Sequence, residues 1–191
     1  MKYVFYQLGR PFAYLTIKHP LKPVYDWIVP LILTFITCAY LYFFSSINLT
    51  IVGAESLIPE LLSFVSGLPG FYIAALAAVA TFNRSDMDLR LPVPTPEIET
   101  LIGGKDQTIK LTRRRYLCLL FAFLTSESIC LIVLTRLLLK TDLSSFGFAT
   151  WAMWFGAFLF FLFFWQLIVA TLYGLFYMGE KMHEPLVQDE E

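Results

Sequence analysis

Four long apolar blocks constrain the fold of this chain more than any other feature of its sequence. They cover residues 27–44, 57–82, 116–139 and 146–178. A helix needs about 20 predominantly apolar residues to cross the hydrocarbon core of a bilayer, and each block has about that length or more. The apolar residues run continuously and do not follow the periods of two or about 3.6 residues that mark half-buried elements. We therefore predict an all-α integral membrane protein, a four-helix bundle.

The composition of the chain excludes an ordinary soluble domain. Of its 191 residues, 58% are hydrophobic and 15% are charged, whereas soluble domains carry about 25% charged residues. The polar surface is too small to face water on all sides, so we expect a lipid bilayer to surround the chain. The length suits one domain.

The distribution of lysine and arginine predicts the orientation. Twelve of the 14 cationic residues precede the first block, lie between the second and third, or follow the fourth; only Arg136 and Lys140 fall on the other side. Loops rich in Lys and Arg stay in the cytoplasm, so both termini and the middle loop are predicted to be cytoplasmic. The predicted segments are an interfacial N-terminal segment, helices one and two, a cytosolic loop, helices three and four, and an acidic tail: 1–26, 27–82, 83–115, 116–178 and 179–191.

Two of the cytosolic segments carry further signals. The N-terminal segment mixes aromatic residues with cations, a pattern typical of a stretch that lies at the membrane interface, either as a plain anchor or with a further role. In the loop, two short β-type runs flank Gly103 and Gly104, which predicts a small hairpin-like insertion. Thr112 then precedes the third block and is a favourable N-cap.

Glu127 is the most informative single residue, because a charged side chain in the middle of a membrane span is costly and usually functional. A ring of glutamates from several subunits can make a cation-selective pore, and the alternative is a structural acid hydrogen-bonded between helices. Gln166, in the fourth block, is the other buried polar group, for which packing between helices is the main alternative. The candidates for lining a pore are Glu127, Thr125, Ser126, Ser128 and Gln166.

Three consecutive arginines, Arg113 to Arg115, begin the third helix. Cations at this position oppose the helix dipole, and the free N–H groups of the first turn favour an anion. A neutralising partner is therefore expected, and it is either anionic lipid, the acidic tail, or a phosphate-bearing ligand such as an oligonucleotide. The candidate ligand-binding residues are Arg113, Arg114, Arg115, Lys110 and Lys105.

Small residues recur at every fourth position of the second block, at Gly70, Ala74 and Ala78. This spacing lets helices approach closely, within the bundle or at an axis shared by protomers. Pro69 just before them is expected to kink the helix. The three cysteines form no pattern for disulfides or zinc, and we find no catalytic motif, so neither an enzyme nor a metal or cofactor is predicted.

Three stretches resemble the small membrane effectors of bacterial antiphage systems: GFYIAALAAVATFNR, the proline-spaced loop and LTRRRYL, mainly within residues 70–140. They are most similar to the membrane effector of the Hailong system and next to the membrane subunit of the Kiwa system. The first resemblance implies a homotetrameric channel of the bacterial inner membrane, held shut by single-stranded DNA oligomers that a cytosolic nucleotidyltransferase makes. It also implies that residues 113–115 contact the oligomer. The second implies a membrane sensor that docks a cytosolic DNA-binding partner.

The function that we expect is an oligomeric ion channel, gated from the cytosol by a polyanion, that depolarises the cell. Four helices with short loops fill their own core, so a polar stripe on the third helix is expected to face neighbouring subunits. The alternative is a non-conducting sensor or scaffold whose loop recruits a soluble effector, and a transporter subunit is a third possibility.

The predicted topology can be tested by labelling single cysteines from outside the cell. Probes at Asn48 and Asp142 should react with an impermeant thiol reagent, and a probe at Gly104 should not, because the Lys and Arg split places only the first two outside. Outside labelling at Gly104 would overturn the orientation.

Overall fold

The computed structural model describes residues 2–44, 57–81, 85–91, 95–102, 105–141 and 149–181. Its main helices are α1 (Lys2–Gly9), α2 (Val29–Phe44), α3 (Leu57–Ser66), α4 (Leu68–Thr81), α5 (Arg113–Lys140) and α6 (Ala149–Phe176). Strands β1 (Glu97–Ile102) and β2 (Lys105–Lys110) form a hairpin. Short 3-10 helices, η1 (Arg10–Thr16) and η3 (Ser85–Asp88), and short π-helices, η2 (Val24–Ile28) and η4 (Tyr177–Lys181), complete the described elements.

Four helical segments within these residues are long and apolar enough to cross a membrane. They are Val24–Phe44, Leu57–Thr81, Arg113–Lys140 and Trp151–Glu180. The all-helical prediction with four such helices and a small hairpin is thereby confirmed. The first segment begins at Val24, three residues before the predicted start, because the π-helix η2 precedes α2 and continues into it. Residues 146–148 of the fourth block lie outside the described residues.

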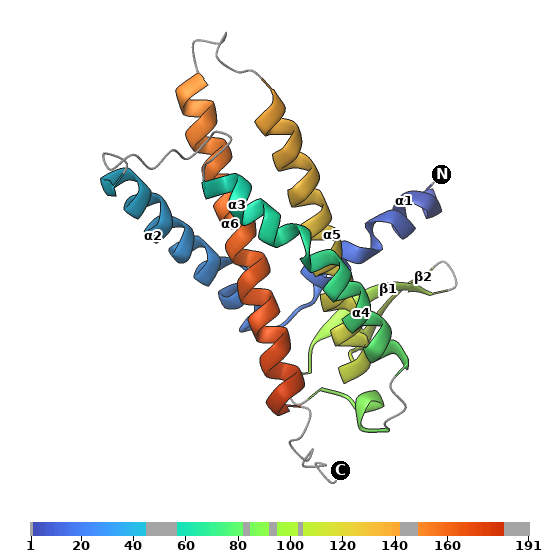
Figure 1. Cartoon of the computed structure of the whole chain (residues 1–191). Helices are drawn as coiled ribbons and strands as arrows, with labels where there is room; N and C mark the ends of the chain where they lie inside the picture. The colour runs from blue at the N-terminus through green and yellow to red at the C-terminus, as the bar shows by residue number, and fades with distance from the viewer. Residues whose placement is uncertain are drawn as a thin grey trace.

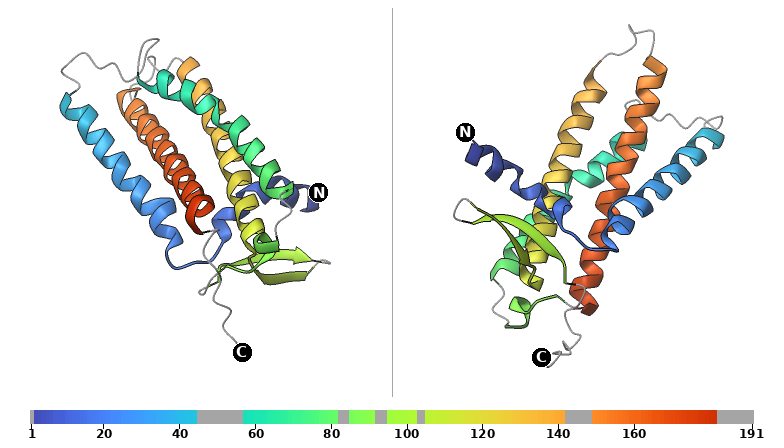
Figure 2. Two further views of the ribbon diagram at one scale, coloured as in Figure 1. Left: turned by 60° about the horizontal axis from the view of Figure 1, so that its bottom comes forward. Right: turned by 180° about the vertical axis from the view of Figure 1, so that it is seen from behind.

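Helix α6 lies at the centre of the bundle, with α2 along one side of it and α5 along the other (Figure 1). Helices α3 and α4 cross the bundle and run down against α5, and the view from behind shows α5, α6 and α2 side by side (Figure 2). The hairpin lies beside the ends at which α2 and α5 begin and α4 and α6 finish. We call this the hairpin end, and the opposite one the far end.

The second long segment is broken where α3 gives way to α4. Gly67 forms the break, and its N–H donates to the carbonyl of Phe64 at 3.2 Å. Pro69 follows as the second residue of α4, where a missing N–H costs no helical hydrogen bond. An interruption is therefore present where Pro69 predicts a kink, but it lies two residues earlier, at Gly67, and Pro69 itself belongs to the first turn of α4.

The hairpin is antiparallel and has the register Thr100↔Gln107, and the predicted turn at residues 103–104 lies outside the described residues. Backbone hydrogen bonds attach it to neighbouring segments: Lys18 donates to the carbonyl of Glu97 at 3.0 Å, and Leu91 donates to that of Leu111, which follows β2, at 3.2 Å. Ile98 is buried beneath β1. The predicted insertion is thus an ordered element fixed to the N-terminal segment and to the start of α5.

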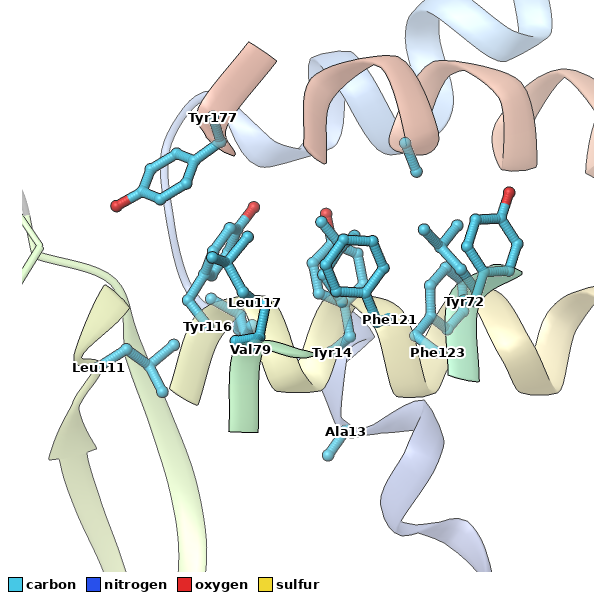
Figure 3. Close-up of a cluster of buried hydrophobic side chains, with 14 of the residues drawn as sticks. Ala13, Tyr14, Tyr72, Val79, Leu111, Tyr116, Leu117, Phe121, Phe123 and Tyr177 are labelled. Carbon is cyan, nitrogen blue, oxygen red and sulfur yellow. The ribbon is translucent and has the colours of Figure 1, made fainter. Parts of the chain in front are cut away.

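Two separate apolar clusters form the core. The hairpin-end core gathers side chains of η1, α4, α5, α6 and η4, and Figure 3 shows Tyr14 of η1, Tyr116 of α5 and Tyr177 of η4 among them. The far core gathers side chains of α2, α3, α5 and α6, among them Leu41, Leu62, Leu131 and Phe161. Ala13, Tyr14 and Ile17 are buried in the hairpin-end core, so the N-terminal segment is part of the packed fold as well as a surface element.

The outer surface of the long helices is apolar. Helix α2 exposes a series of aromatic and aliphatic side chains, the far half of α5 does the same, and Trp151 is 82% exposed. Contiguous apolar surface of this kind is rare on soluble monomers and marks contact with a membrane or a partner.

The small residues of α4 do not pack within the bundle. Gly70, Ala74 and Ala78 are all exposed, and the buried face of α4 is formed by Tyr72 and Val79 instead. The reason is that Tyr72 fills the space against α5 and α6, which turns the small residues outward. Of the two predicted uses of this stripe, packing inside one chain is therefore wrong, and contact between protomers stays a prediction.

Close packing of α6 on α5 at Gly174 yields a stability prediction. A Cβ atom at this position would lie 2.9 Å from Cδ2 of the fully buried Leu120. Gly174→Ala should therefore lower the free energy of unfolding by about 1–3 kcal/mol, the usual cost of overpacking. Thermal unfolding in detergent micelles would measure it. Gly156→Ala in the same helix is the control, because no atom lies within 4 Å of its added Cβ; equal melting temperatures for the two variants would contradict the packing.

Candidate functional site

A polar layer separates the two apolar cores. On α5, Leu124 belongs to the hairpin-end core and Leu131 to the far core, and the buried Glu127 and Ser128 lie between them. On α6 the buried Gln166 lies in the same way between residues of the two cores. We call Glu127, Ser128 and Gln166 the polar layer. Its position explains why the core is divided, since polar groups interrupt apolar packing.

Glu127 is the unusual member of this layer. Its side chain is only 6% exposed, and neither carboxyl oxygen has a hydrogen-bond partner among the described residues. Leaving a buried carboxyl oxygen without a partner is costly, and most buried polar groups are satisfied. Gln166 is buried nearby in the layer but does not donate to it. The expectation of a structural acid hydrogen-bonded between helices is therefore not met inside the described chain.

Glu127 faces the interior of a single chain. It lies on a side of α5 that is buried within the chain, and α5 packs against α3, α4 and α6. This differs from the expectation that the polar stripe of the third helix faces neighbouring subunits. Tyr72 and α6 provide the cover that the sequence did not reveal.

The hydroxyl neighbours of Glu127 are satisfied locally. Thr125 donates to the carbonyl of Phe121 at 2.7 Å and Ser126 to that of Ala122 at 3.0 Å, each one turn back along α5. Ser128 donates to the carbonyl of Thr125 at 2.9 Å. These bonds let hydroxyls sit in an apolar helix at little cost, while each oxygen keeps lone pairs that can accept or coordinate.

A cavity of about 390 Å³ opens at the hairpin end. Its walls come mainly from the N-terminal segment, the start of α5 and the end of α6, and they carry five tyrosines together with His19, Lys22 and Asp26. The tyrosines are Tyr14, Tyr25, Tyr116, Tyr173 and Tyr177.

Asp26 is held by two partners in this cavity. Tyr14 donates its hydroxyl to Oδ1 at 3.1 Å, and Lys22, one helical turn earlier, forms a salt bridge to Oδ2. The ammonium of Lys22 also lies 4.1 Å from the centre of the Tyr14 ring. Burial, and then the neighbouring Tyr116 and Asp26, raise the pKa of Tyr14 well above its usual value. Tyr14 therefore stays protonated and remains a donor to Asp26.

The arginines at the start of α5 point to three different places. Arg113 is buried. Arg114 pairs with both oxygens of Asp88, at 2.7 and 3.0 Å, and donates to the carbonyls of Val79 and Ala80 at the end of α4. Arg115 donates to the hydroxyl of Thr100 at 3.2 Å.

These positions change the role predicted for the arginines. The bonds from Arg114 lower the pKa of Asp88. They also bring the C-terminal carbonyls of α4, the negative end of its helix dipole, to the cations at the positive start of α5. Much of the expected mismatch between cations and helix terminus is therefore relieved within the chain. Lys110 is exposed on β2, the side chain of Lys105 is not described, and the acidic tail lies outside the described residues.

Thr112 is the N-cap of α5, as predicted. Its side-chain oxygen accepts from the N–H of Arg115 at 3.4 Å. The described residues contain no group of three or more histidine, cysteine, aspartate and glutamate side chains placed to hold a metal ion. Cys38, Cys118 and Cys130 are free thiols.

Sequence reasoning missed the group formed by Asp26, Lys22 and Tyr14. The signal was present, since Lys22 and Asp26 have the spacing of an ion pair on one helical face, and Asp26 directly precedes an apolar block. Tyr14 carried no such signal, because its contact with Asp26 depends on how η1 folds back onto α5.

No protein-family model, curated protein or solved structure matches the chain.

The pairing of Asp26 leads to a prediction about stability. Asp26→Leu should lower the unfolding free energy by about 3–5 kcal/mol, because it leaves the ammonium of Lys22 buried without its anion. The double variant Lys22→Met with Asp26→Leu should recover most of that loss, since it removes both charges. Thermal unfolding in micelles measures both variants. Lys18→Met, which breaks the exposed pair with Glu99, is the control and should have no measurable effect; a double variant as unstable as Asp26→Leu would contradict the pairing.

Proposed function

We propose that the chain is an integral protein of the bacterial inner membrane that conducts cations, with its hairpin end in the cytoplasm. The observation that carries this proposal is Glu127, a carboxyl group buried in the middle of an apolar helix with no hydrogen-bond partner in the described chain. A carboxylate in hydrocarbon is costly, and taking up a proton or another monovalent cation removes that cost. Such a group therefore suits a site that a cation occupies in passage.

The orientation rests on the charges. Arg10, Lys18 and Lys22 belong to the N-terminal segment and Arg113 to Arg115 to the start of α5, whereas Arg136 and Lys140 belong to the end of α5. Most cations therefore lie at the hairpin end of the bundle and few at the far end. The positive-inside rule assigns the end that is richer in Lys and Arg to the cytoplasm.

The route proposed for the cation starts in the hairpin-end cavity and leads past Asp26 to Glu127. Asp26 and five tyrosines are among the residues that line its entrance. Asp26 is paired with Lys22 and Tyr14, so it attracts a cation only weakly while these partners are in place. Displacing Lys22 would leave the carboxylate of Asp26 uncompensated, and the group of Asp26, Lys22 and Tyr14 is the proposed element of the gate.

Helix α2 is the element best placed to move during opening. It packs mainly on α6 and η2, and it shares no comparable interface with α5, the helix that carries Glu127. Much of its outer surface is exposed in the single chain, so a movement of α2 along α6 would leave the contacts among α3, α4, α5 and the hairpin in place.

Oligomerisation, polyanion gating and a role in antiphage defence are finer parts of the proposal. The exposed stripe of Gly70, Ala74 and Ala78 supports contact between protomers. For a polyanion such as single-stranded DNA, the structure directs attention to Arg115 and Lys110, because Arg114 is paired internally and Arg113 is buried. The defence role, the homotetramer and the nucleotidyltransferase partner rest on the resemblance alone.

A scaffold that recruits a cytosolic partner is the second candidate function. The observation that favours it is the hairpin, which is attached to the bundle by backbone bonds on both strands' flanks. A short sheet held in this way presents a fixed surface to a partner, with exposed Glu99, Gln107 and Lys110. It would need no ion path.

Ion flux through the purified protein in liposomes tests the leading proposal. Glu127→Gln keeps the shape of the side chain and removes its charge, so cation flux should fall about tenfold, the effect of losing an interaction of about 1.4 kcal/mol. Glu60→Gln is the matched control, because Glu60 is exposed in the first turn of α3, and it should conduct like the wild type.

Two outcomes would decide against conduction by this route. Unchanged flux and selectivity in Glu127→Gln would leave Glu127 a structural residue. A folded wild-type protein that carries no current under any tested ligand would favour the scaffold.

A further inference from the structure

Two arginines from distant parts of the chain converge on one hydroxyl group. Nη2 of Arg10, at the start of η1, lies 3.0 Å from Oγ1 of Thr100 in β1, and Nη2 of Arg115, in the first turn of α5, lies 3.2 Å from the same oxygen. All three side chains are partly buried. Residues 10, 100 and 115 are thus brought together only by the folding of η1, the hairpin and α5.

Among the described side chains, no ion pair balances the charges at this point. A threonine oxygen can accept two hydrogen bonds, but it is neutral. The salt bridges among the described residues join Lys18 to Glu99, Lys22 to Asp26 and Arg114 to Asp88, so none of them involves Arg10 or Arg115. Two guanidinium groups that meet at one neutral oxygen repel each other. An anion between them would reverse the sign of that interaction.

The geometry suits an oxyanion of phosphate type. Guanidinium groups bind phosphate oxygens through paired N–H groups, and the hydroxyl of Thr100 keeps its own hydrogen as a further donor. The start of the 28-residue helix α5 adds the positive end of a dipole. Phosphate oxygens at this point would therefore accept hydrogen bonds from η1, β1 and α5, through Arg10, Thr100 and Arg115.

The surroundings hold these donors in position. The guanidinium of Arg10 lies over the ring of Tyr6, 5.4 Å from its centre. Segment η1 is fixed to α5 by Phe12, whose ring meets Phe123 edge-on at 6.3 Å, and by the buried Tyr14. The N-cap bond of Thr112 fixes the N–H of Arg115. Because these contacts already hold the donors in place, binding an anion costs little further conformational entropy.

The neighbouring surface is that of a membrane boundary. Leu8, Phe12 and Leu15 are exposed on the N-terminal segment, next to Arg10, and the apolar length of α5 begins just past Arg115. The other side of the site is the polar hairpin. An amphipathic boundary of this kind lies where phospholipid headgroups meet the acyl chains.

We infer that Arg10, Thr100 and Arg115 form a binding site for the phosphate of an anionic phospholipid in the inner leaflet. The bound lipid links the N-terminal segment, the hairpin and α5, and its acyl chains lie along the exposed Leu8, Phe12 and Leu15. The inference rests on the proposed membrane orientation and is independent of whether the protein conducts ions.

Lipid binding to the full-length protein in micelles tests this inference. Short-chain phosphatidic acid should raise the melting temperature of the wild type, and phosphatidylcholine of the same chain length should not. The variants Arg10→Gln, Arg115→Gln and Thr100→Val should each weaken phosphatidic acid binding, the arginine variants by about tenfold or more, as expected for loss of a charge-assisted hydrogen bond. Arg90→Gln, an exposed cation at the same end, is the control for net charge and should bind like the wild type.

The alternatives give different results in the same assay. Wild-type binding by all three variants would overturn the inference. Stabilisation by inorganic phosphate or by a single-stranded oligonucleotide, with the same dependence on Arg10 and Arg115 but with no effect of phosphatidic acid, would overturn the assignment to lipid. Should an arginine variant fail to fold, Thr100→Val, which keeps the side-chain shape, still decides the question. Failure of ion flux with intact lipid binding would reject the proposed function alone.

Discussion

The fold depends on the requirement that polar groups placed among apolar helices find partners within the protein. Hydroxyl side chains meet it locally: each donates to a backbone carbonyl of its own helix, as in Thr34, Thr37, Ser66, Thr125, Ser126 and Thr171. Larger groups need another element. Tyr72 of α4 shares a hydrogen bond of 2.5 Å with Thr171 of α6, and Trp165 of α6 donates to Thr37 of α2. These bonds join helices that are otherwise held by apolar packing, which is non-directional.

The same requirement explains why the three arginines diverge. Successive residues of a helix point about 100° apart, so Arg113, Arg114 and Arg115 cannot share a partner. Arg114 faces α4, where free carbonyls of the last turn and Asp88 meet it. The positive start of α5 and the negative end of α4 are thereby joined through one side chain. That contact fixes the two helix ends relative to each other and places Arg115 beside the hairpin.

Features that depend on local composition could be predicted from the sequence. Features that depend on contacts between distant segments could not. Long apolar runs revealed the four helices, alternation around two glycines revealed the hairpin, and Thr112 revealed the start of α5, because each signal lies within a few residues of the feature. The stripe of Gly70, Ala74 and Ala78 was ambiguous, since its spacing does not say which neighbour it meets; Tyr72 occupies the packed face instead. Likewise, no local pattern could show that Arg10 and Arg115 would meet at Thr100.

The two interior carboxyl groups show how the chain divides structural and functional roles. Asp26 has a cation and a hydroxyl donor, and these partners belong to segments that must fold together, so its charge organises the hairpin end. Glu127 has no partner in the described chain and interrupts the apolar core. Isosteric apolar residues would close that interruption and extend the packing of Leu124 to Leu131. Within the proposed function, a cation supplies the partner that Glu127 lacks among the described residues, since a carboxylate binds cations.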